Sequence, residues 1–291
     1  MAVRGAGGRM TELVIVGYDG SAESEAALHW GVDEACARRL PLMLCHAWRW
    51  PYPAEYADRD TKTIVQRMGR NILERGGAVA GDLAPGLEVR TLLVDGPACA
   101  GLLTESDEAS LIVIGSHDPD AVPIGSTALQ LPGRAPGPVI VVRRAGSAER
   151  RIVAGADGSP GGDAALGFAF GEAELRGWCV QAVYGYWDPG VSEDLSLYSD
   201  LEELRRASGA RLERAVAPWR DRYPRVPVRT SLVPSQPRSA LMEAASGADL
   251  IVVGARGSAD PHPLDTGITT MTLLRRAACP VAVVRADGAD A

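Results

Sequence analysis

Residues 14–28 read VIVGYDGSAESEAAL, and residues 152–166 read IVAGADGSPGGDAAL. Each copy opens with a short apolar run and continues through an Asp-Gly-Ser turn into a helix-forming segment. Two further blocks repeat in the same order. LIVIGSH is matched later by LIVVGAR, and PVIVVRR is matched later by PVAVVRA. Three matched blocks at a nearly constant offset predict a duplicated chain with two similar domains.

The length of the chain agrees with this duplication. It has 291 residues, and a domain has about 150 residues on average. We place the first domain at residues 11–146 and the second at residues 149–286, with the join in the polar stretch 143–150. Residues 1–10 are rich in Gly and Arg and contain no apolar core, so we expect a flexible tail and not a secretory signal.

Short apolar runs alternate with helical patterns in each copy. The runs at 13–16, 111–114 and 139–142 are continuously apolar, which is typical of parallel strands covered on both faces. Longer amphipathic helices are expected at 55–81 and 200–222. Each copy therefore predicts the order β-α-β-α-β-α-β-α-β, a doubly wound, Rossmann-like α/β domain with right-handed crossovers.

The composition excludes several classes of protein. Thirty basic and thirty-seven acidic residues give a formal charge of -7, so broad nucleic-acid binding is not expected. No apolar stretch reaches the roughly 18 residues that a membrane-spanning helix needs. The five cysteines are scattered and show no metal-binding spacing, which predicts reduced, mostly buried thiols in a cytoplasmic protein.

The ligand site of such a sheet lies at the carboxyl ends of the strands, where the strand order reverses. The turn after the first strand carries Asp19 or Asp157, and the turn after the fourth carries Gly115 or Gly254. In the second copy, GARG begins at Gly254 and is followed by nine residues, Gly267 and a helical pattern. Glycines let backbone N–H groups approach an anion, and a helix N-terminus adds further donors. The pattern predicts a site for a phosphate chain, with the aspartate facing a ribose or a base.

These residues resemble the universal stress protein family over almost the whole chain, from Thr11 to Arg285. The resemblance is carried by the two domain starts, by GARG-x9-G and by CPVAVVR. It implies a five-stranded parallel sheet of order 3-2-1-4-5 in each domain. It also implies pairing through the last strands, so PVIVVRR and PVAVVRA would meet within one chain, and it leaves a homodimer open. One branch of the family binds ATP through G-x2-G-x9-G-[S/T], and another branch does not.

The resemblance implies an ATP site in the second copy, with or without Mg²⁺. Asp157 would contact the base or ribose, and the backbone of Gly185 would contact the adenine. The phosphates would lie against the glycine turn and the next helix: Val253, Gly254, Gly257, Gly267, Ile268 and Thr269. Ile268 stands where the family has Ser or Thr, so one hydroxyl donor is lost, at a cost of about 1 kcal/mol. The backbone N–H of Ile268 remains, and Thr269 and Thr270 are candidates to replace the hydroxyl.

The first copy departs further from the pattern. Asp118 stands where the second glycine belongs, and only six residues separate it from Gly125. A carboxylate repels a phosphate by about 1–4 kcal/mol at about 4 Å, depending on the dielectric. Pro132-Gly133 is expected to interrupt the helix that follows. We therefore expect the second site to be the better one, and the weaker first-site candidates are Asp19, Ala47, Gly115, Gly125 and Ser126.

The leading interpretation is an ATP-binding regulatory protein of the stress-response type. An interaction or scaffold module that has lost nucleotide binding stays open as an alternative, because of Ile268 and Asp118. A slow ATPase is the third possibility. No GxSxG, HExxH or Walker lysine motif is present, so we assign no catalytic residue and expect at most weak hydrolysis. The sequence assigns no metal ligand and names no regulatory partner.

Overall fold

The computed structural model describes residues 12–50, 59–116, 126–143, 148–186, 198–257 and 266–286. The predicted tail, residues 1–10, lies outside them. The first domain contains β1 (Leu13–Gly17), α1 (Ala22–Arg38), β2 (Leu42–Trp48), α2 (Arg59–Leu83), β3 (Val89–Asp95), α3 (Ala98–Glu105), the 3-10 helix η2 (Ser106–Glu108), β4 (Ala109–Gly115), α4 (Thr127–Arg134) and β5 (Val139–Val142). The second contains β6 (Arg151–Gly155), α5 (Pro160–Arg176), β7 (Cys179–Gly185), α6 (Tyr198–Arg222), β8 (Val228–Val233), α7 (Pro237–Ala245), β9 (Leu250–Gly254), α8 (Ile268–Arg276) and β10 (Val281–Val284).

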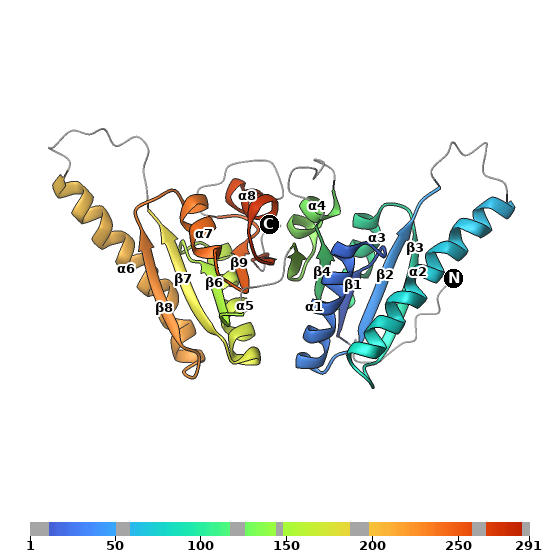
Figure 1. Ribbon diagram of the computed structural model, residues 1–291. Helices are drawn as coiled ribbons and strands as arrows, with labels where there is room; N and C mark the ends of the chain where they lie inside the picture. The colour runs from blue at the N-terminus through green and yellow to red at the C-terminus, as the bar shows by residue number, and fades with distance from the viewer. Residues whose placement is uncertain are drawn as a thin grey trace.

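The strands form one ten-stranded sheet in the order β3-β2-β1-β4-β5-β10-β9-β6-β7-β8 (Figure 1). Each half has the predicted order 3-2-1-4-5, and all neighbouring strands within a half are parallel. The two halves join through an antiparallel pair, with Val281 opposite Val141 and Val283 opposite Val139. The predicted meeting of the last strands is therefore confirmed, and neither of these two edges stays open.

The continuously apolar strands are explained by two cores, one on each face of the sheet. In β1, Val14 and Val16 belong to the core under α1, α2, α5 and α6, whereas Leu13 and Ile15 belong to the core under α3, α4, α7 and α8. Because side chains alternate along a strand, both sets need apolar residues when both faces are covered. Among the described residues, no helix is long and apolar enough to cross a membrane.

Serine caps begin the first helix of each domain. Ser21 caps α1 by accepting a hydrogen bond from the N–H of Ser24, and Ser159 caps α5 by accepting one from Gly162. The predicted interruption at Pro132 is wrong, because α4 continues through Pro132 to Arg134. Pro132 removes one backbone hydrogen bond and its ring crowds the carbonyl of Ala128, but the helix is short and the side chains of Leu129 and Leu131 are buried in the core.

Two buried glutamates and two partly buried arginines join the two domains beneath the sheet. We call Glu34, Arg38, Glu172 and Arg176 the charge quartet. Within each helix, Arg38 Nε lies 3.0 Å from Glu34 Oε2, and Arg176 Nε lies 3.1 Å from Glu172 Oε2. Across the interface, Arg38 pairs with Glu172 and Arg176 pairs with Glu34. Both glutamate side chains are 0% exposed, whereas Arg38 and Arg176 are partly exposed, so the quartet ties α1 to α5 at the edge of the buried interior.

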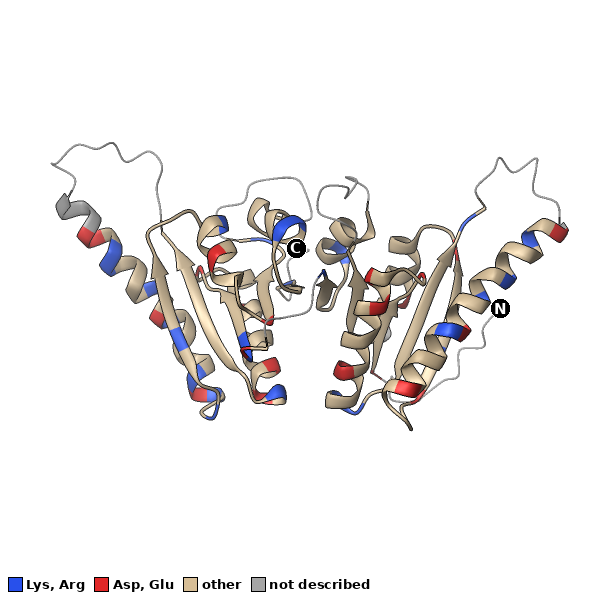
Figure 2. Cartoon of the chain, viewed as in Figure 1, with Lys and Arg blue, Asp and Glu red and all other residues tan. Residues whose placement is uncertain are grey.

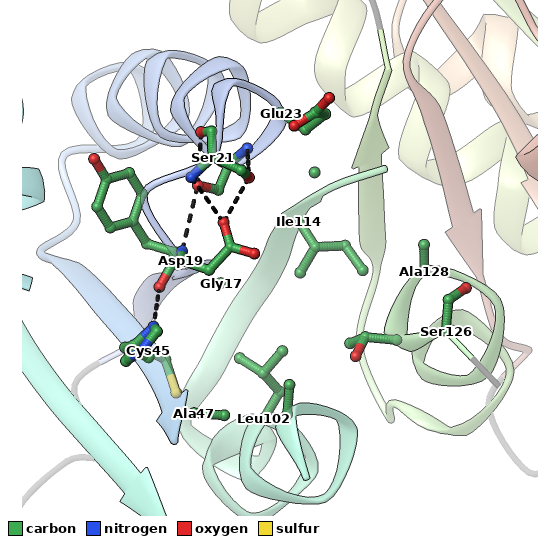
Figure 3. A pocket seen from close by; sticks show the side chains of 16 residues that line it. Gly17, Asp19, Ser21, Glu23, Cys45, Ala47, Leu102, Ile114, Ser126 and Ala128 are labelled. Carbon is green, nitrogen blue, oxygen red and sulfur yellow. Dashed lines mark hydrogen bonds between the residues drawn. The ribbon is translucent and has the colours of Figure 1, made fainter. Parts of the chain in front are cut away.

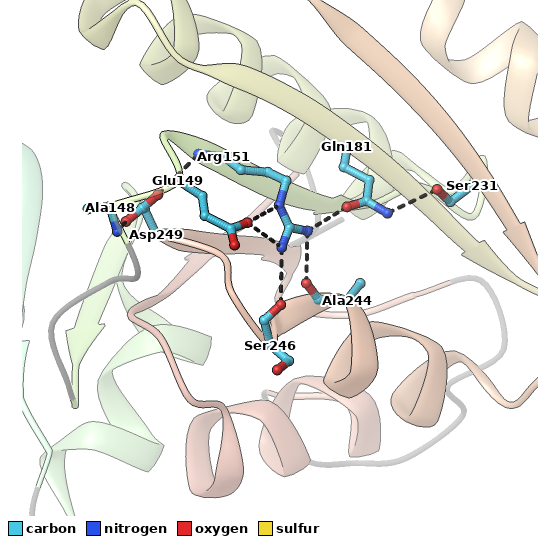
Figure 4. Close-up of polar contacts among 8 residues, drawn as sticks. All are labelled: Ala148, Glu149, Arg151, Gln181, Ser231, Ala244, Ser246 and Asp249. Carbon is cyan, nitrogen blue, oxygen red and sulfur yellow. Dashed lines mark hydrogen bonds and ion pairs between the residues drawn. The ribbon is translucent and has the colours of Figure 1, made fainter.

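A second polar network anchors the start of the second domain (Figure 4). The buried carboxylate of Asp249 accepts hydrogen bonds from the N–H groups of Ala148 (2.7 Å) and Arg151 (3.1 Å). The Arg151 guanidinium donates to Gln181 Oε1 (2.6 Å) and to two backbone carbonyls at the end of α7. These contacts fix the chain as it enters β6, directly after the join.

Candidate functional site

Each domain has a crevice at the carboxyl ends of its strands. The first crevice measures about 380 Å³ and the second about 330 Å³. In both, the turn after the first strand of the domain meets the turn after the fourth, as the sequence predicts. The residues predicted for the second site all line its crevice: Asp157, Gly185, Val253, Gly254, Gly257, Gly267, Ile268 and Thr269. Asp19, Ala47, Gly115 and Ser126 line the first, whereas Gly125 and Asp118 lie outside the described residues.

The aspartate after the first strand builds the turn that carries it. Asp157 Oδ1 accepts hydrogen bonds from the N–H of Ser159 (2.9 Å) and from its hydroxyl. Gly158 supplies the positive φ of +72° that this turn requires. In the first domain, Asp19 accepts from the N–H of Ser21 at 3.0 Å in the same way (Figure 3). One carboxylate oxygen is thus committed to the turn, and Asp157 Oδ2 faces the glycine turn opposite.

The glycine turn packs directly on the first turn of α5. A Cβ on Gly254 would lie 2.6 Å from the carbonyl carbon of Gly161, and a Cβ on Gly161 would lie 2.1 Å from the carbonyl oxygen of Arg256. A Cβ on Gly257 would lie 2.9 Å from Asp157 Oδ2. No side chain fits at Gly254 or Gly161, because the close atoms there are backbone, whereas at Gly257 only the end of the Asp157 side chain would have to shift. The backbone around the crevice is therefore held close to two helix N-termini, those of α5 and α8.

Gly185 has a packing role as well as its predicted place at the adenine. A Cβ there would lie 2.7 Å from the carbonyl oxygen of Ser235 and 2.9 Å from Cα of Pro237. The end of β7 therefore touches the backbone turn that leads into α7. Ala47 holds the matching position in the first domain, so that domain accommodates a methyl group there.

The start of α8 forms one end of the second crevice. Gly267 is its N-cap and contributes no side-chain acceptor to the first turn. The N–H of Gly267 donates to Ala255 (2.8 Å), and the Thr270 hydroxyl donates to the carbonyl of Gly254 (2.8 Å). The proton of Thr270 is therefore used to tie α8 to the glycine turn. Thr269, which lines the crevice, is the remaining candidate for the missing hydroxyl.

The two crevices differ in the charge of their lining residues. Arg256 lines the second crevice, where Asp157 is the carboxylate among the described lining residues. In the first, Asp19 and Glu23 both line the wall, and none of its described lining residues is Lys or Arg (Figure 3). Glu23 occupies the position that Gly161 has in the second copy. The second crevice therefore has an arginine in its described lining, and the first has two carboxylates.

Sequence reasoning missed both Glu23 and Arg256. A glutamate in the first turn of a helix is ordinarily explained by the helix dipole, which hides a role at a pocket wall. Aligning DGSAES with DGSPGG places Glu23 opposite a glycine, and that comparison is the signal that finds it. Arg256 stood inside the GARG motif, where only the glycines were assigned.

The first crevice also contains polar groups of its own. The Ser126 hydroxyl is buried and has no hydrogen-bond partner among the described residues. His46 Nδ1 lies 2.8 Å from the carbonyl oxygen of Tyr18. Burial raises the pKa of Cys45 to about 12, so its thiol is protonated at neutral pH and is not a nucleophile. No group of three or more His, Cys, Asp or Glu in the described part of the chain is placed to hold a metal ion.

Comparison with known proteins agrees with this architecture. The universal stress protein family matches the chain twice, over residues 10–143 and 149–285. A universal stress protein of Mycolicibacterium smegmatis is 31% identical over 290 residues, covering 94% of this chain and 96% of that protein. One from Mycobacterium tuberculosis is 31% identical over 289 residues with the same coverage of both chains, 94% and 96%. The crystal structure of a universal stress protein from Archaeoglobus fulgidus shares the fold over 95% of this chain and 97% of that chain, at 16% identity and a TM-score of 0.70. The chain therefore belongs to the universal stress protein family and carries the family's domain twice.

Proposed function

We propose that this protein is a cytoplasmic, ATP-binding regulator of the stress response and that ATP occupies the second crevice. The phosphates would lie between the turn at Gly254–Gly257 and the first turn of α8, with the adenosine toward Asp157 and Gly185. One observation carries this proposal: two helix N-termini, a side-chain-free backbone turn and Arg256 converge on a single crevice. Such a site suits a chain of negative charge.

The same argument ranks the two domains. Glu23 and Asp19 both line the first crevice, and the described lining there contains no Lys or Arg, so we expect a polyphosphate to be less favoured there than in the second crevice. We therefore expect one tightly bound nucleotide per chain, in the second domain. Asp157 is the one carboxylate in the described lining of this crevice. A bound Mg²⁺ would therefore take most of its oxygen ligands from the phosphates and from water. Bound there, the ion would neutralise phosphate charge.

Hydrolysis is expected to be slow. The described lining of the second crevice includes no lysine and no histidine, and one oxygen of Asp157 is already committed to its own turn. Asp157 Oδ2 is then the remaining carboxylate oxygen among these residues, with no described lysine beside it to neutralise charge, so we expect weak hydrolysis at most. Nucleotide occupancy, and not turnover, would carry the regulatory signal.

A scaffold without nucleotide is the second candidate, and Ile268 favours it. This side chain is 55% exposed at the crevice wall, where the family's ATP-binding branch has a hydroxyl. An exposed isoleucine suits a protein contact better than a phosphate contact.

The deciding experiment measures nucleotide in the purified protein. The protein is prepared without added nucleotide, denatured, and its released small molecules are identified and counted per chain. About one adenine nucleotide per chain supports the proposal, and about two would show that the first crevice also binds. None released, together with no heat of binding when ATP is added back, would support the scaffold.

The position of the site is tested by Gly257→Asp, which places a carboxylate beside Asp157 in the phosphate region. We expect ATP binding to be lost while the thermal midpoint of unfolding stays close to that of the parent. Gly81→Asp in α2 is the matched control, because a Cβ on Gly81 meets nothing within 4 Å. ATP binding that survives Gly257→Asp unchanged would show that the assignment is wrong.

A further inference from the structure

A second hollow adjoins the nucleotide crevice on the outer side of α7 and α8. We call it the arginine groove; it measures about 540 Å³ and is lined by Arg238, Thr266, Ile268, Thr272, Arg275 and Arg276. Helices α7 and α8 pack against each other, and both carry basic residues in Figure 2. Ile268 lines the groove and the crevice alike, so the two hollows are neighbours across one side chain.

The groove has the chemistry of an anion site. Three guanidinium groups line it, and none of its described lining residues is acidic. Arg275 Nε is buried and has no hydrogen-bond partner among the described residues. Buried donors are almost always paired, so this donor is available to an acceptor that the described residues do not supply. Planar guanidinium groups bind phosphates through two parallel hydrogen bonds.

Helix electrostatics do not explain all three arginines. Arg275 and Arg276 lie in the last turn of α8, where a cation is favoured by the helix dipole. Arg238 lies in the first turn of α7, next to Pro237, where a positive charge is disfavoured. The cation at the start of α7 therefore has another cause, and the groove that it lines supplies one.

The duplication gives an internal comparison. Pro237 and Leu241 in α7 match Ala98 and Leu102 in α3, because each pair lines the crevice of its own domain. Arg238 then corresponds to Cys99. Counting back from Pro280 and Pro138, Arg275 corresponds to Gly133, and only Arg276 has a basic counterpart, Arg134. The shared fold does not need these arginines, so two of the three are particular to the second domain.

We propose that the arginine groove binds a linear polyphosphate chain longer than the triphosphate of ATP. The chain would pass the glycine turn, cross Ile268 and end on Arg238 and Arg275. The phosphate chain would be either free polyphosphate or part of a nucleotide. The nucleotide form depends on the ATP site proposed above, whereas the free form does not. The second domain thereby distinguishes long from short phosphate chains.

Calorimetry with three probes tests this: ATP, adenosine 5′-tetraphosphate and linear inorganic polyphosphate. We expect the parent protein to bind the tetraphosphate about tenfold more tightly than ATP, the worth of one charge-assisted hydrogen bond. Arg238→Gln/Arg275→Gln removes that advantage and leaves ATP binding unchanged. Raising the salt concentration weakens the advantage in the parent. The matched control is Arg205→Gln/Arg206→Gln on the exposed face of α6, which makes the same charge change and keeps the advantage.

The outcomes separate the groove from the nucleotide site. If ATP does not bind, but inorganic polyphosphate binds and needs both arginines, the proposed function is wrong and the groove stands. If ATP binds and neither longer probe gains affinity, the groove proposal is overturned and the nucleotide site stands. Equal losses in the groove variant and the α6 control would also overturn it. Should the double variant unfold, Arg238→Gln alone, at an exposed position, gives the same comparison.

Discussion

The charge quartet predicts that replacing one of its glutamates by the neutral glutamine will lower the free energy of unfolding of the protein. Glu34→Gln keeps the size of the side chain and removes one of the two negative charges that face Arg38 and Arg176. Glu34 is 0% exposed and accepts from both arginines, one in its own helix and one in the other domain. The substitution leaves two partly exposed guanidinium groups against a single buried carboxylate, that of Glu172.

The structure gives the size of the effect. Breaking a buried ion pair from one side costs about 3–5 kcal/mol. The two arginine side chains are 23% and 12% exposed, so water relieves part of the loss and we expect about 3 kcal/mol. For a chain of this size that corresponds to a fall of about 6–12 °C in the midpoint of thermal unfolding. Glu172→Gln is expected to cost the same, because the quartet is nearly symmetric.

The assay is urea unfolding followed by tryptophan fluorescence. The Arg176 guanidinium lies 4.8 Å from the ring centre of Trp30 and 5.0 Å from that of Trp178, so both rings report on the quartet. Midpoint and slope are compared together, since a two-domain chain need not unfold in one step. A double-mutant cycle of Glu34→Gln with Arg176→Met isolates the contact between domains.

A matched control comes from the same helix as Arg176. Glu174 pairs with Arg225 at 3.0 Å, but these side chains are 38% and 86% exposed. Glu174→Gln should therefore cost less than about 0.5 kcal/mol, and the cost should shrink further in high salt. If Glu34→Gln costs no more than Glu174→Gln, or if the cycle shows no coupling, the quartet does not hold the domains together and the reasoning fails.

Three further predictions concern the crevices and the thiols. Glu23→Gly should raise the affinity of the first crevice for ATP, detected as a second binding event in calorimetry; an unchanged single event would contradict the charge argument. Thr270→Val should cost about 1 kcal/mol of unfolding free energy by removing the bond to Gly254 and should weaken ATP binding; equal ATP affinity would mean that this bond does not shape the site. Burial raises the pKa of Cys45 and of Cys279 to about 12, above the ordinary value of 9.0. Because the thiols of the unfolded chain ionise first, the free energy of unfolding should fall as the pH rises from about 9 to about 12, and Cys45→Ala and Cys279→Ala should each flatten that fall. At neutral pH the exposed Cys36 should react with a thiol reagent in the native protein, while these two react only after unfolding.

The sequence predicted the duplication, the strand order and the place of the crevices, because these follow from periodicity, from repeated blocks and from a family resemblance. It failed where side chains from distant segments meet. The quartet joins Arg38 to Glu172, which are 134 positions apart, and no local pattern links them. Pro132 misled because the burial of its helix outweighs one lost hydrogen bond. The contact between Gly185 and Ser235 depends on how two loops pack, so no local pattern predicts it, and the place of Gly185 at the adenine stays a prediction.

The antiparallel seam between β5 and β10 has a consequence for how the two crevices can diverge. When two identical chains pair through such strands, every substitution is inherited by both crevices, and the assembly stays symmetric. Here the pair is covalent, so a glutamate at one wall and a glycine at the other belong to the same gene product in a fixed one-to-one ratio. One crevice is free to lose a ligand or acquire a new one while its neighbour keeps the old. Two different domains are thus paired within one chain, as two subunits are in a heterodimer. This asymmetry requires neither a second gene nor matched amounts of two proteins.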